Sequence, residues 1–83
     1  MKYQYTPVGV CARSIIVELD GDVLKSVEFV GGCDGNHKGI CSLAVGMKAE
    51  DICSRLTGIT CGFRNTSCPD QLAKAVGEAM QHE

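Results

Sequence analysis

Residues 14–30 have the sequence SIIVELDGDVLKSVEFV, and this stretch decides the fold that we expect. Large apolar side chains occupy every second position of residues 14–20 from Ile15 to Leu19, which is the period of a strand with one buried face. The sequence Asp-Gly-Asp at positions 20–22 suits the tight turn of a hairpin. The stretch therefore predicts two antiparallel strands.

The second strand of this hairpin is expected over residues 23–30. Its apolar residues Val23, Val27 and Phe29 are expected on one face. A short third strand is expected over residues 3–6, before a proline. Three antiparallel strands with one packed face can be stable, whereas an isolated hairpin is marginal.

The second half of the chain changes to a helical period. One helix is expected between residues 36 and 46, where Ile40, Leu43 and Ala44 have helical spacing, and a second over residues 49–56. The third begins near Pro69, which suits a first helical position and puts Cys68 at or near the cap. Its apolar face has the spacing i, i+3, i+4, i+7, i+8 and consists of Leu72, Ala75, Val76, Ala79 and Met80. We expect a two-layer α+β fold, with a three-stranded antiparallel sheet followed by helices on one of its faces.

Length and composition limit the classes of protein. With 83 residues, the chain is expected to be one domain, residues 1–83. Its net charge is −2, its basic residues are scattered, and it has only two Phe, two Tyr and no Trp. These features argue against direct binding of nucleic acids. The start of the sequence has no apolar leader, and no apolar run reaches the roughly 18 residues of a membrane span. We expect a soluble, cytoplasmic protein that does not bind membranes.

Six cysteines in 83 residues require an explanation. Cys11 precedes the first strand of the hairpin and Cys33 follows the second, so the two should lie close together. Cys61 and Cys68 flank the segment before the last helix. If that helix begins at the same end of the sheet, these two cysteines lie close to Cys11 and Cys33. Four convergent thiolates suit zinc, or alternatively iron or an iron-sulfur cluster. The sequence predicts a metal site formed by Cys11, Cys33, Cys61 and Cys68.

Other interpretations of the cysteines stay open. Small buried cysteines often serve only as apolar packing, and this interpretation is favoured for Cys41 and Cys53, which lie inside expected helices. A redox pair or a disulfide is a further alternative. Cys68 has a special position, because the start of a helix favours a thiolate. His37 could be a fifth ligand or a proton carrier, but a solvated loop histidine is the interpretation that we favour.

Four short sequences carry a resemblance to a known family. They are GVC at 9–11, FVGGCDGN at 29–36, GITCG at 58–62 and TSCPDQLA at 66–73. Together they make the chain resemble a TSCPD-domain protein over nearly its whole length. The closest kin implied are short members called ribonucleotide reductase-related, because similar domains occur at the C-terminal end of some reductases. The resemblance implies metal binding by the same four cysteines.

A more distant similarity is to the U-type iron-sulfur scaffold proteins. Cys11, Cys33 and Cys68 occupy the places of the three scaffold cysteines, and this similarity implies the two-layer α+β fold of that superfamily. Arg13 stands where the scaffold has an Asp, and Ser67 stands where it has a His. A fourth cysteine, Cys61, makes the site look more closed than a transfer site.

These observations lead to one leading function and two alternatives. The leading function is a metal-binding accessory or regulatory domain associated with ribonucleotide reductase, which makes deoxyribonucleotides for DNA synthesis. Its expected partner is the large subunit of that enzyme. Reductase activity by the chain alone is excluded, because 83 residues cannot hold a nucleotide pocket, a radical site and an electron relay. The alternatives are an iron-sulfur assembly or carrier protein and a metal-free thiol-redox module.

Overall fold

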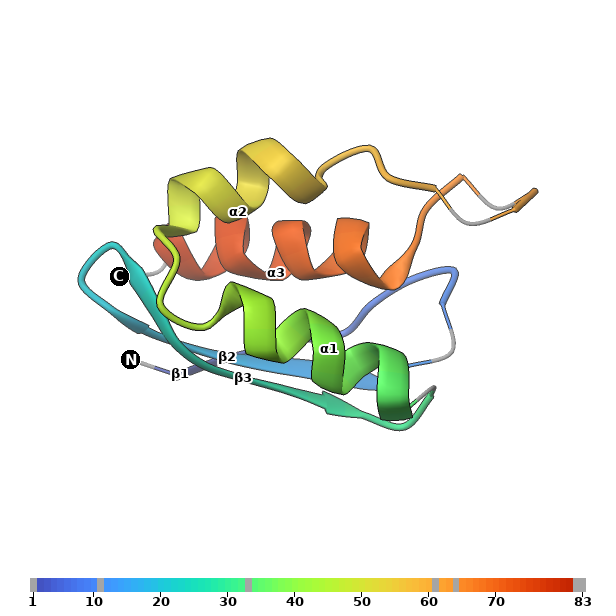
Figure 1. The fold of residues 1–83 in the computed structure, drawn as a ribbon, viewed down its shortest axis with the longest axis horizontal. Helices are drawn as coiled ribbons and strands as arrows, with labels where there is room; N and C mark the ends of the chain where they lie inside the picture. The colour runs from blue at the N-terminus through green and yellow to red at the C-terminus, as the bar shows by residue number, and fades with distance from the viewer. Residues whose placement is uncertain (1, 11, 33, 61, 64, 82–83) are drawn as a thin grey trace.

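A computed structural model of the chain describes residues 2–10, 12–32, 34–60, 62–63 and 65–81. Its elements, in chain order, are β1 (Lys2–Tyr5), β2 (Ser14–Asp20), β3 (Val23–Val30), α1 (Asp34–Ala44), α2 (Ala49–Leu56) and α3 (Cys68–Gln81). The strands form one sheet and the helices lie over one side of it (Figure 1). The predicted α+β fold, with a three-stranded antiparallel sheet followed by helices, is confirmed.

The sheet has the order β1-β2-β3, and both neighbouring pairs are antiparallel. The bounds predicted for β2 and β3 are confirmed, while β1 starts and ends one residue earlier than expected. Gly21 has a φ of 64° in the two-residue turn, a conformation that costs glycine little. At the other end of the hairpin, Ser14 pairs with Val30, and the N–H of Arg13 donates to the Val30 carbonyl. The start of β2 and the end of β3 are thus neighbours, as predicted.

A β-bulge corrects one detail of the predicted sheet. Leu19 pairs with Leu24 and Glu18 with Ser26, so Lys25 is an extra residue on β3. The extra residue reverses the alternation of faces, and Leu24 becomes fully buried. The prediction that Val23 lies on the same face of β3 as Val27 and Phe29 is therefore wrong.

Two of the helices cover the sheet directly. Figure 1 shows α1 running over β3, while α3 packs against β1 and β2. The remaining helix, α2, packs against α3, and the N–H of Ala49 at its start donates to the Asp22 carbonyl in the hairpin turn. The core lies between these layers and is built from Ile15, Val17, Leu19, Leu24, Ala44, Ala49, Ile52, Leu72, Ala75, Val76 and Ala79.

The helices also differ from the predictions in detail. The bounds of α2 and the burial of Ile52 are confirmed. Leu43 is 79% exposed, because α1 directs the face through His37 and Ala44 toward the core. Met80, near the end of α3, is 37% exposed, whereas Ala79 beside it is buried. Among the helices in the described ranges, none has the length and apolarity that crossing a bilayer requires.

Candidate functional site

Cys68 is the first residue of α3, and the preceding serine holds the start of that helix. The Ser67 hydroxyl accepts a hydrogen bond from the N–H of Asp70 at 3.2 Å, which is the bond of an N-cap residue to the third helical residue. The same hydroxyl donates to the Ile59 carbonyl at 2.7 Å. The helix cap is thus Ser67, and Cys68 follows it as the first helical residue, which agrees with its predicted position at or near the cap. Its half-buried thiol lies where helix N–H groups favour negative charge.

His37 lies against this thiol. Its Nε2 atom is 3.1 Å from the Sγ atom of Cys68, so that either an imidazole N–H donates to a thiolate or an S–H donates to the bare nitrogen. The imidazole stacks on Phe29 of β3, with ring centroids 4.2 Å apart and an angle of 17° between the planes. His37 is only 4% exposed and belongs to the first turn of α1. The interpretation of His37 as a solvated loop residue is wrong.

The contact joins the beginnings of two helices. Figure 1 shows α1 and α3 both beginning at the right-hand end of the molecule, where the β1–β2 and α2–α3 connections also lie. The positive ends of two helix dipoles therefore meet near the His37–Cys68 contact, and each favours a thiolate or another anion there.

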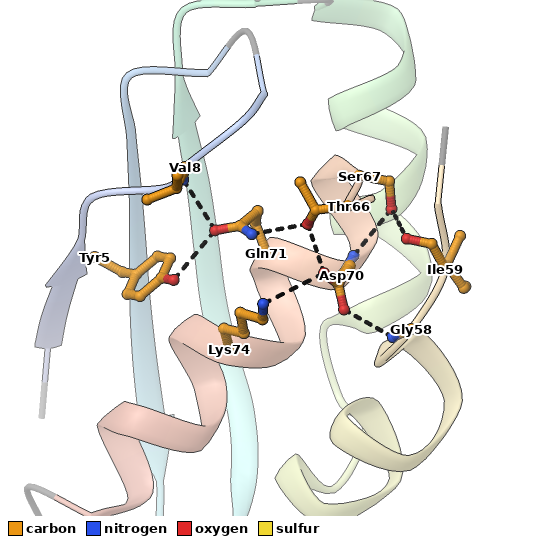
Figure 2. A network of polar contacts seen from close by, with 9 residues as sticks. All are labelled: Tyr5, Val8, Gly58, Ile59, Thr66, Ser67, Asp70, Gln71 and Lys74. Atoms are coloured by element: carbon orange, nitrogen blue, oxygen red, sulfur yellow. Dashed lines mark hydrogen bonds and ion pairs between the residues drawn. The ribbon is translucent and has the colours of Figure 1, made fainter. Parts of the chain in front are cut away.

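The buried carboxylate of Asp70 links the α2–α3 connection to α3 through hydrogen bonds. Asp70 is 4% exposed and accepts hydrogen bonds from the N–H of Gly58 at 2.7 Å and from the Thr66 hydroxyl at 2.5 Å (Figure 2). The Lys74 ammonium lies 3.7 Å from the same carboxylate. The pKa of Asp70 is lowered chiefly by the bond from Thr66, then by the bond from Gly58, while burial opposes the shift. The ionised carboxylate thus stabilises this arrangement.

Gln71, the next residue, links the β1–β2 connection to the start of α3. The amide oxygen of Gln71 accepts from the Tyr5 hydroxyl and from the N–H of Val8, both at 3.1 Å. Its amide nitrogen donates to the Thr66 hydroxyl at 2.8 Å, so that one continuous network links both connections (Figure 2). The polar residues around Cys68 therefore act as positioning residues for two segments of the chain.

The other described cysteines are placed differently. Cys53 donates from its thiol to the Ala73 carbonyl at 3.4 Å, and burial raises its pKa. Burial also raises the pKa of Cys41, which lines a groove of about 620 Å³ between β3 and α1. Both thiols are held in the protonated form, which agrees with the interpretation that they pack as apolar groups. His37 forms part of the wall of the same groove.

The predicted metal site is only partly within the described residues. Cys11, Cys33 and Cys61 lie outside them, and Cys68 lies inside. Within the described ranges, no three side chains of His, Cys, Asp or Glu are placed to hold a metal ion. The four-thiolate site therefore stays a prediction. The histidine beside Cys68 could have been found from its spacing, because His37 precedes Ile40 and Ala44 by three and seven residues on one helical face.

Comparison with known proteins agrees with the residues gathered here. A model of the TSCPD domain matches residues 1–80. The comparison with curated proteins found no match, and neither did the comparison with solved structures. The Thr66, Ser67, Asp70 and Gln71 side chains around Cys68 all belong to the TSCPDQLA sequence noted above. Since the match extends over nearly the whole sequence, the chain belongs to the TSCPD-domain family.

Proposed function

We propose that the chain is a metal-binding accessory domain associated with ribonucleotide reductase. The observation that carries this proposal is the thiol of Cys68, held at a capped helix start with the imidazole of His37 at 3.1 Å. Thiolate sulfur and imidazole nitrogen are both common ligands of zinc, which is the metal that we propose. Iron or an iron-sulfur cluster is the alternative.

The donors at this end of the molecule fit such an ion. Two described donor atoms, His37 Nε2 and Cys68 Sγ, lie together. In the sequence, the predicted ligand Cys11 lies between β1 and β2, Cys33 between β3 and α1, and Cys61 between α2 and α3. A site of this kind contributes to folding, because its ligands converge only in the folded chain. This matters for a domain of 83 residues, whose core is small. The metal would hold the connections together and orient them.

The association with the reductase rests on the family. We propose the large subunit of ribonucleotide reductase as the partner and a regulatory or assembly role, without catalysis by this chain alone. The test is a binding measurement between the purified domain and that subunit, with and without metal. Binding that disappears when a chelator removes the metal supports the accessory role. Absence of binding in both states contradicts it.

Metal binding is tested on protein purified without oxygen. Elemental analysis and an absorption spectrum should give one colourless zinc ion per chain, whereas a cluster would be brown. Cys68→Ser should lose most of the metal, and its melting temperature should become insensitive to chelator. Cys53→Ser is the matched control, because its sulfur bonds a backbone carbonyl instead. Equal metal contents in the two variants would remove Cys68 from the site.

The same pair of residues favours one second candidate, a metal-free thiol module. An imidazole beside a thiol at a helix start stabilises the thiolate, which is the reactive form. The two candidates differ in iodoacetamide labelling of Cys68, read by mass spectrometry with and without chelator. A bound metal protects Cys68 until the chelator removes it. Labelling that is equally fast in both samples, on protein without metal, supports the thiol module and contradicts the metal site.

A further inference from the structure

We propose that His37 is itself a metal ligand, so that the site combines imidazole nitrogen with thiolate sulfur. This inference rests on the proposed function, because it replaces one of the four thiolates of the metal site proposed there with the imidazole of His37. Its basis is the contact between His37 Nε2 and Cys68 Sγ. The two residues come from the first turns of α1 and α3, so a shared ion would join both helices to each other at their starts.

The distance between the two atoms suits one shared ion. With Zn–S at about 2.3 Å and Zn–N at about 2.0 to 2.1 Å, tetrahedral geometry puts the sulfur and nitrogen about 3.5 Å apart. The observed separation is 3.1 Å. A shift of roughly 0.4 Å would admit the ion between the lone pairs of the two donors, and a small rotation of the half-buried cysteine side chain is enough to supply it.

The imidazole is already oriented for this role. Stacking on Phe29 fixes the plane of the ring, and burial to 4% exposure removes most of its contact with water. Its Nε2 atom is therefore directed at the sulfur before any metal binds. An ordered, partly dehydrated ligand loses little side-chain entropy on coordination, which favours affinity.

The charge of the site also favours a histidine. Four thiolates around a divalent ion leave a net charge of −2, whereas three thiolates and a neutral imidazole leave −1. A larger net charge costs more to bury, and the described surroundings on this side include the aromatic ring of Phe29. The mixed donor set therefore costs less to bury beside β3 than an all-sulfur set does.

A competing role for His37 would be a hydrogen bond from its N–H to a metal-bound sulfur. Loss of affinity cannot separate the two roles, since removing such an outer partner also weakens binding about 10- to 100-fold. The donor count does separate them. Zinc bound to the full chain should show one nitrogen at about 2.0 to 2.1 Å in addition to sulfurs at about 2.3 Å by X-ray absorption at the zinc edge.

The experiment compares four proteins loaded with Zn²⁺ alone: the natural chain, His37→Gln, His37→Cys and His82→Gln. His82 is the other histidine of the sequence and serves as the matched control. We expect the nitrogen signal to vanish in His37→Gln and to persist in His82→Gln. His37→Cys should bind zinc more tightly than His37→Gln does, with sulfur donors only, because a new thiolate replaces the lost ligand. Circular dichroism of each protein reports whether it is folded.

The outcomes distinguish this inference from the proposed function. A natural chain that binds one zinc through sulfur alone overturns the ligand role of His37 and leaves the metal site intact. A nitrogen signal that persists in His37→Gln, or that disappears in His82→Gln, overturns it equally. A natural chain that binds no metal contradicts the proposed function, and the inference fails with it.

Discussion

Replacing Asp70 with alanine should destabilise the domain more than any substitution of an exposed aspartate. The carboxylate accepts two hydrogen bonds, one from the N–H of Gly58 at 2.7 Å and one from the Thr66 hydroxyl at 2.5 Å. Alanine leaves both donors without this acceptor in a place where Asp70 is only 4% exposed. The ion pair with Lys74 at 3.7 Å adds little, because that lysine side chain is 51% exposed.

The expected loss follows from these two bonds. A hydrogen bond to a charged group contributes about 1.5 to 3 kcal/mol, so two bonds set an upper limit of about 3 to 6 kcal/mol. The α2–α3 connection can move and return its N–H group to water, which reduces the loss to about 2 to 4 kcal/mol. A chain of this length has a total stability of roughly 4 to 12 kcal/mol. The melting temperature should therefore fall by roughly 8 to 30 °C.

Thermal and urea denaturation, followed by circular dichroism on metal-free protein, measure this loss. Asp51→Ala is the matched control, since Asp51 is an exposed aspartate in the first turn of α2 and should change stability by about 0.5 kcal/mol or less. Because the folded chain lowers the pKa of Asp70, its contribution is present above about pH 4 and is lost as the pH falls below that value. The free energy of unfolding of the Asp70→Ala protein should lack this acid-sensitive contribution. A loss below about 1 kcal/mol, or one equal to that of the control, would refute the reasoning.

Two further predictions concern Tyr3 and Gly9, which precede the helices in the sequence. Tyr3 has a pKa raised above its ordinary value, chiefly because its hydroxyl donates to Glu78 at 2.6 Å, so Glu78→Gln should let Tyr3 ionise at lower pH in a spectrophotometric titration. An unchanged titration would contradict the contact. Gly9 has a φ of +76°, and a Cβ atom there would lie 3.0 Å from the Thr66 side chain, so Gly9→Ala should cost about 1 to 3 kcal/mol in urea denaturation. Gly39→Ala, inside α1 with open space around the new atom, should be neutral or stabilise by up to about 1 kcal/mol, and the same loss in both variants would contradict the argument.

The elements of the fold could be predicted from the sequence where a single period extends over several residues. The alternation in β2, the hairpin turn and the helical face of α3 are local patterns, and the structure confirms them. The bulge at Lys25 could not be predicted, because it depends on how Leu24 packs against Leu19 across the hairpin. Leu43 and Met80 were expected on the apolar faces of their helices but are exposed. Which side of a helix is buried depends on how the sheet and the other helices pack against it.

The candidate site was predictable only in part for a related reason. The position of Cys68 at the start of a helix follows from Pro69 and the apolar spacing beyond it. Its neighbour His37 is 31 residues away in sequence, and their contact depends on α1 and α3 beginning at the same end of the sheet. The spacing of His37 to Ile40 and Ala44 indicates the covered face of α1, but it does not identify the neighbours of the imidazole. The contact with Cys68 and the stacking on Phe29 are set by the packing of the folded chain.

The residues around Cys68 stabilise the start of α3 through different kinds of interaction. Ser67 caps the helix, while Asp70 and Gln71 hold the two long connections against its start. None of these bonds requires a metal, so the beginning of α3 is ordered by polar contacts of the protein itself. A site organised in this way should bind its ligand without refolding the helix layer. Loss of Asp70 should then weaken metal binding indirectly, by releasing the connection, whereas loss of Cys68 removes a donor and leaves the fold of α3 in place.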